Sequence, residues 1–400
     1  MAGQEILYMK IFNYIKGLIE DGTLKPGDRI PTEMELAEEF KVSRITAIRA
    51  ANELERSGYV YRVRKKGTIV NSPVLHNNTG NSQPVIPMIL PFGEPFQKEF
   101  GANIGYELLT GAQSEAQKRN CMITLYNTEQ TAAREREVLE MLLELNLFGI
   151  IVYPTDDYSY DNIAVYSKYL IKKTPMVFLD HPPLLANIPC ITSDNETGMY
   201  ELVSRLIRKG HTKIAYYCDS LTRYPNQASR FKGFSKAMIE AGVTLNNQYV
   251  FEFYLFRQQY DKLSLDGKAD MSREEYCING ILDKILAMDD PPTAIVCVND
   301  LSAVALQREA IKRGIRIPED FSLTGFDNLS IDNHLIPPLT SVSQNLYEIG
   351  RKSVQLLFDI KEGKPVHSDY KMKTAVVERD SVADINGFGM GSAAGKEAAI

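Results

Sequence analysis

The chain has 400 residues, of which 44% are hydrophobic and 24% are charged, and its formal net charge is −6. This length predicts two or three compact units, and the ordinary composition excludes a mainly disordered chain. The acidic balance argues against nucleic acid as a partner of the whole chain, so a nucleic-acid-binding role requires a local basic segment. No apolar run reaches membrane-spanning length and residues 1–10 lack the apolar core of a signal peptide, so we expect a cytoplasmic protein without a membrane partner.

The first 70 residues have the pattern of a small helical domain followed by a hairpin. Apolar residues recur at helical spacing over 7–19 and predict a first helix. Thr32 and Glu35 have the spacing of a capping box and predict the start of a second helix. Ser43 is placed to cap a third helix, and two short strands follow around the basic turn at 64–67. We therefore expect residues 1–70 to fold as one compact unit.

The segment from Lys41 to Lys66 is strongly basic within an acidic chain. It contains eight basic and two acidic residues, which is the asymmetry that contact with phosphates requires. A helix–turn–helix inserts the beginning of its second helix into the major groove, where side chains must donate to base edges and phosphates. The predicted DNA-binding residues are Thr32, Glu33, Ser43, Arg44, Thr46 and Arg49, together with Lys65, Lys66 and Gly67 of the hairpin. The alternative is that these charges only keep a small domain in solution.

This segment resembles the GntR family of bacterial regulators over nearly the whole of residues 5–70. The matching residues are Pro26-Gly-Asp-Arg-Ile-Pro-Thr-Glu33, Leu36-Ala37, Phe40-Lys-Val-Ser-Arg44, Thr46, Leu54, Gly58 and Gly67-Thr68. The resemblance implies a winged helix-turn-helix in which Arg44 and Thr46 contact the operator. Two positions depart from the family: Ile48 stands where an arginine is usual, with Arg49 one place later, and Lys65 replaces the first glycine of the wing.

The rest of the chain alternates between short apolar runs and helical segments. Residues 71–84 are polar and bounded by prolines, which predicts a linker. The apolar runs lie at 85–92, 121–126, 148–153, 175–180, 213–218, 294–298 and 321–326, with helical segments between them. This alternation predicts parallel sheets covered on both faces, and about 300 residues are too many for one such sheet, so we expect an α/β fold with two subdomains.

Polar side chains follow several of the predicted strands. Asp180 ends the run at 175–180, Asn299 follows the run at 294–298, and Asp327 follows the run at 321–326. Ligands of open α/β folds bind at the carboxyl ends of the strands. A sugar pocket needs carboxylate, amide and guanidinium groups for its hydroxyls and aromatic faces for its C–H surfaces. The sequence therefore predicts a pocket for a small, sugar-like effector.

This region also resembles the LacI family and the related periplasmic sugar-binding proteins, over roughly residues 85–385. The residues concerned are Ser193-Asp-Asn-Glu-Thr-Gly198, Lys209-Gly-His-Thr-Lys-Ile214, Ser229-Arg230, Gly233-Phe234, Ala294-Ile-Val-Cys-Val-Asn-Asp300, Ile317-Pro-Glu-Asp320, Gly325-Phe-Asp327 and Pro338-Leu-Thr-Ser-Val342. The resemblance implies that the effector is held by Arg230, Asn299 and Asp327, with Asp180 as a fourth contact and Glu94, Phe96 and Tyr106 closing the pocket from the other subdomain. It also implies a periplasmic-binding-protein-like domain.

The domain plan that follows has four parts. The winged-helix domain occupies 1–70, the linker 71–84 and the effector domain 85–385, and a disordered tail is expected at 386–400. Within the effector domain, we expect one subdomain at about 85–193 and 345–364 and the other at about 194–344 and 365–385. The chain should then cross between the subdomains near Asp194, Gln344 and Lys364.

A GntR-type winged-helix domain joined to a LacI-type effector domain is the arrangement of the arabinose repressor group. The resemblance implies a homodimeric repressor of carbohydrate-utilisation genes that binds operator DNA and is released by a sugar, with L-arabinose or another pentose as the first candidate. The alternatives are a different sugar, a sugar phosphate or a nucleoside as effector, or a ligand-activated activator.

An enzyme on the α/β scaffold and a solute-binding transport component are the readings from other classes. The chain has no GxGxxG after the first strand of the α/β region, no GxxxxGK[ST] and no Gly-x-Ser-x-Gly. Its five cysteines form no CxxC pair and have no histidine at metal-ligand spacing, so we expect reduced core thiols. We therefore expect neither catalytic residues nor a metal or cofactor, and the basic N-terminal segment opposes a transport role.

Overall fold

The computed structural model describes residues 7–25, 27–57, 59–63, 67–70, 83–92, 95–155, 160–182, 185, 188–222, 224–265 and 272–386. The chain divides into two compact units, Met1–Ser82 and Gln83–Ile400. The predicted tail apart from Asn386, and the predicted linker apart from its last two residues, lie outside the described residues. In the part of the chain that is described, no helix is both long and apolar enough to span a bilayer.

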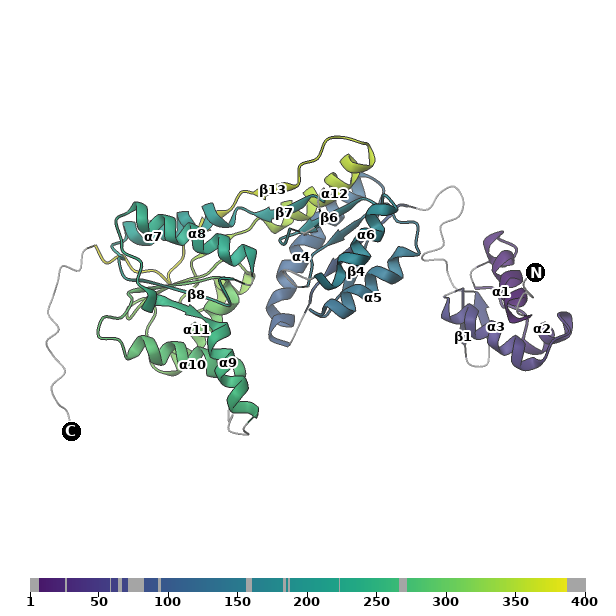
Figure 1. Ribbon diagram of the computed structural model, residues 1–400, viewed down its shortest axis with the longest axis horizontal. Helices are drawn as coiled ribbons and strands as arrows, with labels where there is room; N and C mark the ends of the chain where they lie inside the picture. Colours follow the sequence, from purple (N-terminus) through teal and green to yellow (C-terminus); the bar gives the residue numbers. More distant parts are fainter. Residues whose placement is uncertain are drawn as a thin grey trace. The chain divides into compact units, whose positions relative to one another are not determined.

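The first unit is built from three helices and a β-hairpin (Figure 1). Its elements are α1 (Leu7–Glu20), α2 (Glu33–Glu39), α3 (Arg44–Arg56), β1 (Val60–Val63) and β2 (Gly67–Val70). Thr32 caps α2 and Ser43 caps α3 through their side-chain oxygens, as their spacing predicts. The helices pack around a core that includes Ile11, Ile15, Leu36, Ala47 and Leu54, all fully buried. This is the winged helix-turn-helix arrangement predicted from the sequence.

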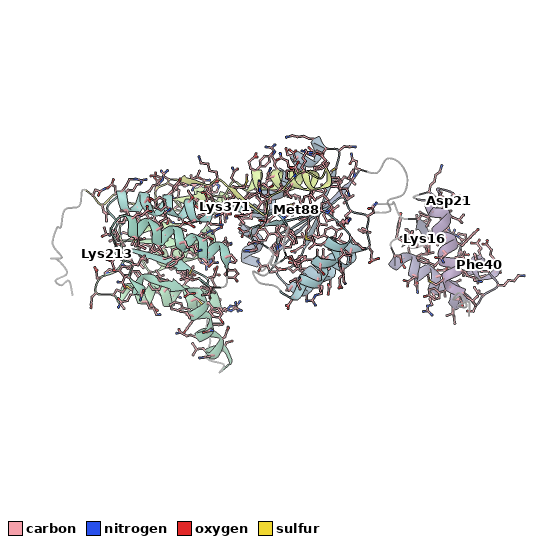
Figure 2. The ribbon with its side chains drawn as sticks, turned by 45° about the horizontal axis from the view of Figure 1, so that its top comes forward. Lys16, Asp21, Phe40, Met88, Lys213 and Lys371 are labelled. Carbon is pink, nitrogen blue, oxygen red and sulfur yellow. The ribbon has the colours of Figure 1, made fainter. Side chains whose placement is uncertain are left out.

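The second unit begins with a six-stranded parallel sheet in the order β13-β7-β6-β5-β3-β4. Its strands are β3 (Val85–Leu90), β4 (Met122–Asn127), β5 (Ile150–Val152), β6 (Met176–Leu179), β7 (Cys190–Ser193) and β13 (Asp369–Met372). The helices of this N-terminal subdomain are α4 (Pro95–Lys118), α5 (Ala132–Leu143), α6 (Ile163–Ile171) and α12 (Leu346–Lys361), with a 3-10 helix at Tyr160–Asn162. Every residue of β3, β5 and β6 is buried, as parallel strands covered on both faces require; Met88 marks β3 in Figure 2.

The C-terminal subdomain contains a four-stranded parallel sheet in the order β11-β10-β8-β9. Its strands are β8 (Ile214–Cys218), β9 (Val250–Glu252), β10 (Ala294–Cys297) and β11 (Ser322–Thr324). Its helices are α7 (Asn195–Arg208), α8 (Pro225–Glu240), α9 (Phe253–Leu265), α10 (Arg273–Leu286) and α11 (Asp300–Lys312), with 3-10 helices at Asn247–Tyr249 and Ser330–His334. The short strands β12 (Ser341–Ser343) and β14 (Ala375–Val377) pair antiparallel. Both sheets are parallel, so the α/β prediction is confirmed.

Two glycines let helices α4 and α12 approach closely. A Cβ on Gly111 would lie 2.0 Å from the carbonyl oxygen of Tyr347, and a Cβ on Gly350 would lie 2.0 Å from the carbonyl oxygen of Leu108. Only glycine leaves room for backbone at such distances. Helix α12 follows the second crossing of the chain and comes from a distant part of the sequence. Its contact with α4 holds it in the N-terminal subdomain (Figure 1).

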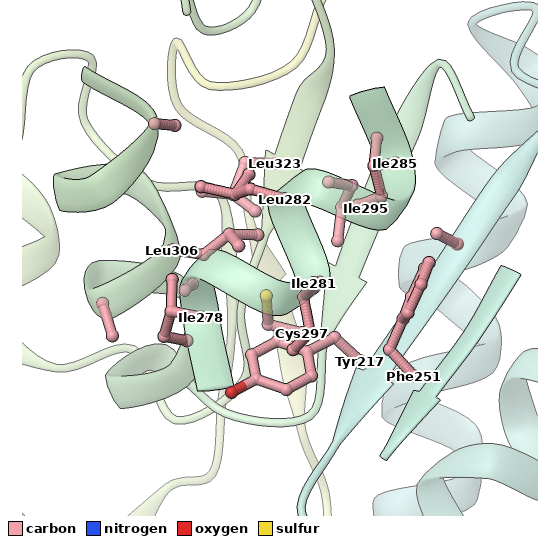
Figure 3. Close-up of a cluster of buried hydrophobic side chains, with 14 of the residues drawn as sticks. Tyr217, Phe251, Ile278, Ile281, Leu282, Ile285, Ile295, Cys297, Leu306 and Leu323 are labelled. Atoms are coloured by element: carbon pink, nitrogen blue, oxygen red, sulfur yellow. The ribbon is translucent and has the colours of Figure 1, made fainter. Parts of the chain in front are cut away.

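The C-terminal subdomain has buried clusters on both faces of its sheet, one against α7 and α8 and the other against α10 and α11. Ile278, Ile281 and Leu282 of α10 pack on side chains of β10 and β8, and Figure 3 shows this cluster with Tyr217 at its edge. Tyr217 is only 2% exposed, and Figure 3 shows its phenol oxygen at the margin of the cluster. A close-packed cluster of this kind gives the neighbouring surface a rigid floor.

The third crossing between the subdomains differs from the prediction. It was expected near Lys364, but the chain first adds β13 to the N-terminal sheet, in parallel register with β7 (Tyr370 opposite Ile191). The physical reason is the alternation of this strand: Tyr370 and Met372 pack against the core of the N-terminal subdomain, whereas Asp369 and Lys371 are exposed. The segment 369–372 therefore belongs to the N-terminal subdomain; Lys371 is labelled in Figure 2.

Candidate nucleic-acid interface and effector site

The first turn of α3 carries three of the predicted DNA-binding residues. The hydroxyl oxygens of Ser43 and Thr46 lie 2.8 Å apart, and the backbone N–H of Thr46 donates to the Ser43 oxygen at 3.2 Å. Arg44 lies between them, is exposed, and forms no hydrogen bond or ion pair with the described residues. Ile45 is also 78% exposed. The turn is thus held by its own cap while the guanidinium of Arg44 is available to a base edge or a phosphate.

The predicted DNA-binding residues Thr32, Glu33 and Arg49 have partners within the unit. The Glu35 carboxylate accepts hydrogen bonds from the backbone N–H and the hydroxyl of Thr32 at 2.6 and 2.8 Å, which lowers the pKa of Glu35. Glu33 lies 3.8 Å from a guanidinium nitrogen of Arg62 on β1. The guanidinium of Arg49 lies over the ring of Tyr8 on α1, 4.2 Å from its centroid.

The turn of the wing is only partly described. Lys65 and Lys66 lie outside the described residues, whereas Gly67 begins β2 with a φ of +93°. This left-handed conformation favours glycine, and a Cβ there would lie 2.7 Å from Nε of Arg29. Gly67 therefore acts through the shape of the hairpin, because it presents no side chain to DNA.

A cavity of about 570 Å³ lies between the two subdomains of the second unit. Its lining from the N-terminal subdomain includes Phe92, Ile104, Leu108, Tyr153, Thr155 and His181. Its lining from the C-terminal subdomain includes Asp219, Tyr224, Asn226, Gln227, Arg257 and Asn299. The volume and the mixture of aromatic faces with amide, carboxylate and guanidinium groups are typical of a site for a small polar ligand.

Asp180 links the two walls of this cleft. It follows β6 with a left-handed φ of +62°, so its carboxylate turns away from the strand direction. Its Oδ2 accepts a hydrogen bond from the Tyr153 hydroxyl at 2.8 Å and another from the side-chain amide of Asn226, on α8 of the other subdomain, also at 2.8 Å. Burial and the neighbouring Asp180 carboxylate raise the pKa of Tyr153, so this phenol remains a proton donor.

Arg230 and Asp327 form a buried network at the crossings between the subdomains. The guanidinium of Arg230 lies 3.7 Å from the Asp327 carboxylate and 3.8 Å from the centroid of the Phe326 ring. It donates to Asn195 Oδ1 at 2.8 Å and to the Val298 carbonyl at 2.6 Å. Burial raises the pKa of Asp327, and the positive charge of Arg230 opposes that shift.

The same network contacts two of the three crossings directly. Gln344, which precedes α12, donates from its side-chain nitrogen to Asp327 and accepts at Oε1 from the Ser193 hydroxyl at 2.7 Å. Asn195 donates back to the Ser193 carbonyl at 3.1 Å. The side chain of Asp327 is therefore bonded, through Gln344 and Ser193, to two of the segments that join the subdomains.

Comparison with known proteins identifies both units. The family model "Bacterial regulatory proteins, gntR family" matches residues 7–70, and "Periplasmic binding protein-like domain" matches residues 203–382. The HTH-type transcriptional repressor PurR of Vibrio cholerae serotype O1 (strain M66-2) is 30% identical over 284 residues, which cover 70% of this chain and 77% of PurR. The chain belongs to the bacterial transcription repressors of the GntR/LacI type. The Arabinose metabolism transcriptional repressor of Geobacillus stearothermophilus is 26% identical over 383 residues, 94% of this chain and 98% of that protein.

Solved structures of regulators share the fold of this GntR/LacI-type repressor. The transcription regulator CcpA of Lactococcus lactis has a TM-score of 0.59 at 23% identity and covers 75% of this chain and all of its own. The complex of the transcriptional regulator CelR with cellobiose has a TM-score of 0.60 at 19% identity and covers 88% of this chain and all of its own. The relatives are transcription regulators and not enzymes, as the sequence predicts.

The structure separates the predicted effector residues of this GntR/LacI-type repressor into two groups. Asn299 lines the cleft, and its side chain also caps α11 by accepting from the Ser302 N–H at 2.8 Å. Asp180 does not line the cavity itself but accepts hydrogen bonds from two residues that do, Tyr153 and Asn226. Arg230 and Asp327 are 3% and 7% exposed and are not among the residues that line the cavity.

The contacts predicted from the opposite subdomain are placed differently. Tyr106 is 66% exposed and does not line the cavity, because α4 turns Ile104 and Leu108 toward it instead. Glu94 and the side chain of Phe96 lie outside the described residues.

Several residues of the cleft were missed by the sequence reasoning. Tyr153 directly follows β5, so the rule used for Asp180 would have found it. Asn226 follows Pro225 at the first turn of α8, where a loop ends and a helix begins. Arg257 lies on α9, whose sequence mixes aromatic, polar and charged residues without a clear apolar face, so no pattern marked it as a site residue.

Proposed function

We propose that this chain represses carbohydrate-utilisation genes in the cytoplasm and is released from its operator when a small sugar enters the cleft. The observation that supports this most is the wall of the cleft, where Asn226, bonded to the Asp180 carboxylate behind it, lines the cavity together with Tyr153 and Tyr224. Carboxylate and amide groups match the hydroxyls of a sugar, and aromatic rings match its C–H faces. The relative from Geobacillus stearothermophilus, which aligns over both units, is a repressor of arabinose metabolism.

The proposed switch uses the three crossings between the subdomains. A sugar that contacts both walls favours closure, and closure rotates one subdomain against the other. The network of Arg230, Asp327 and Gln344 contacts two crossings and must adjust when they rotate. In a homodimer, this rotation changes the spacing of the two winged helices, which must match half-sites about one DNA turn apart. Such coupling is typically worth about 1–3 kcal/mol.

The proposed DNA contacts start from the first turn of α3. Ser43, Arg44 and Thr46 would read the major groove, and Arg44 is the member that is exposed and unbonded. The remaining predicted residues would support this contact from α2, from the second turn of α3 and from the wing.

L-arabinose or another pentose is the first candidate effector, because of the relative named above. A different sugar, a sugar phosphate or a nucleoside is the alternative, as is activation in place of release. A thermal-shift panel of pentoses, hexoses, their phosphates and nucleosides distinguishes these ligands. A ligand at 100 times its dissociation constant raises stability by about 2.7 kcal/mol, which is a shift of a few degrees in a domain of this size.

The ligand that shifts the melting temperature is then added to a complex of the protein with duplex DNA selected from a random pool. Release of the DNA supports the proposal, and tighter binding indicates an activator or a co-repressor mechanism. If no sugar shifts the melting temperature while another class of small molecule does, the proposal of a sugar-responsive repressor is wrong.

A further inference from the structure

We propose that the cleft continues into a second sugar subsite, so that the effector is a neutral glycoside of at least two sugar units. This inference rests on the proposed function, because it assigns the size and charge of the ligand that the same cleft takes. It starts from a second cavity of about 460 Å³ in the C-terminal subdomain.

The two cavities are parts of one cleft. They share the lining residues Gln130, Asp219, Tyr224, Arg257, Asn299 and Leu301. Each of the two volumes lies within the range of small-molecule sites, about 300–1,000 Å³. A single sugar ring held at Tyr153 and Asn226, which line only the first cavity, would therefore leave the part of the second cavity at Arg273 without a ligand.

The floor of the second cavity is rigid and partly aromatic. Tyr217 and Ile278 line it and belong to the buried core of the subdomain (Figure 3). Phe253 packs against the same core, and Tyr254 beside it is 41% exposed. Aromatic side chains at the open end of a polar cleft provide faces on which the C–H surface of a second ring can stack.

The charged groups around this second cavity balance one another. Arg257, Arg273, Asp219 and Glu274 all line it, and Arg257 also lies 3.8 Å from the Asp261 carboxylate on its own helix. The Asp219 carboxylate is oriented by the side-chain amide of Gln227, which donates to it at 2.8 Å. No ion pair among the described residues involves Arg273 or Glu274. Equal numbers of carboxylates and guanidinium groups favour an uncharged, hydroxyl-rich ligand over a phosphate, which two nearby carboxylates would repel.

Calorimetric titration of the full-length protein tests this inference with matched pairs of sugars. The pairs are L-arabinose with α-1,5-arabinobiose, D-xylose with xylobiose, and D-glucose with cellobiose and with maltose; L-arabinose 5-phosphate is the charged probe. We expect one disaccharide to bind at least ten-fold more tightly than its monosaccharide. Arg273→Gln should remove most of that difference without changing the affinity for the monosaccharide, because Arg273 lines only the second cavity.

Arg134→Gln is the matched control, because it replaces an exposed arginine of the N-terminal subdomain that lines neither cavity. Equal affinity for a monosaccharide and its disaccharides, or unchanged disaccharide binding by Arg273→Gln, would overturn the second subsite and leave the proposed function intact. Tighter binding of the phosphate than of every neutral sugar would overturn the assignment of a neutral ligand. Binding of none of these sugars would count against the proposed function itself.

Discussion

Two arginines that the sequence marks for function, Arg44 and Arg230, lie in opposite environments. Arg44 is exposed on the first turn of α3 and bonds to none of the described residues. Arg230 is 3% exposed and bonds to Asn195 and Val298 beside Asp327. The comparison teaches that a motif residue can act by meeting a ligand or by holding the elements that move. Substitution should therefore affect binding in the first case and folding in the second.

Arg230→Ala should have the largest effect on stability. It leaves the Asp327 carboxyl, which is 7% exposed, without its counter-charge and removes donors from Asn195 and Val298. Breaking a buried pair by removing one partner typically costs about 3–5 kcal/mol. Urea unfolding followed by circular dichroism measures the loss.

Arg316→Ala provides the control for that measurement. Arg316 pairs with Asp320 at 2.9 Å on the surface, with 69% of its side chain exposed, and such pairs contribute about 0–1 kcal/mol. If Arg230→Ala were as mild as this control, Arg230 would have no structural role, and the contrast between the two arginines would be lost.

Arg44→Ala should leave stability unchanged within about 0.5 kcal/mol and weaken operator binding by about 1–3 kcal/mol, or roughly 5- to 150-fold. The physical reason is that the guanidinium has no partner among the described residues to lose. Fluorescence anisotropy with duplex DNA selected by the wild-type protein measures the affinity.

Arg49→Ala is the control variant on the same helix, because it removes the contact with Tyr8 and should lower stability by about 0.5–1 kcal/mol. If Arg44→Ala bound DNA as tightly as the wild type, the first turn of α3 would not be the surface that contacts DNA.

The contrast between these regions also explains what could be predicted from the sequence. The caps of α2 and α3 depend on residues three positions apart, Thr32 with Glu35 and Ser43 with Thr46, so local spacing was sufficient. The α/β class followed from alternation along the chain. Pairing of Tyr370 with Ile191 joins residues far apart in sequence, and no local pattern indicated it.

The division of the effector residues could not be predicted for the same reason. Asp180 and Asn299 follow strands, and the rule that ligands bind at strand ends placed them near the cleft. Arg230 is buried because Asn195, Val298 and Phe326, from three separate segments, converge on it. Burial of that kind depends on tertiary packing and is not visible in the spacing of its motif.

A third prediction concerns the acid pair beside this network. Asp332 is fully buried, and its two carboxyl oxygens have no hydrogen-bond partner among the described residues; the neighbouring Asp300 accepts from the Ser341 hydroxyl at 2.6 Å. Burial and the negative charge of Asp300 raise the pKa of Asp332, so the folded protein keeps a proton that the unfolded chain releases above about pH 4. Stability that is present below that pH is therefore lost as the pH rises toward the raised pKa.

Asp332→Asn removes this titration and keeps a hydrogen-bond donor. The melting temperature of the wild type should fall relative to that of the variant as the pH is raised from 5 to 9. Scanning calorimetry measures this difference. Asp289→Asn, on an exposed turn, is the control and should show a constant offset. A constant offset for Asp332→Asn as well would mean that this pair does not hold a shared proton in the folded state.

Asn226→Ala should have the smallest effect on stability. It compares a residue that lines the cleft with the buried network of Arg230. It removes the hydrogen bond to Asp180 between the subdomains. The Asp180 carboxylate keeps its hydrogen bond from the Tyr153 hydroxyl, so we expect a loss of about 1 kcal/mol, the value of one hydrogen bond, rather than the cost of a buried unpaired group. Sugar affinity should fall by about 2- to 10-fold, the value of one neutral hydrogen bond. Gln248→Ala, on the far 3-10 helix, is the control for both measurements. A stability loss as large as that of Arg230→Ala would place Asn226 with the hinge network, and the wall of the cleft would then be structural as well.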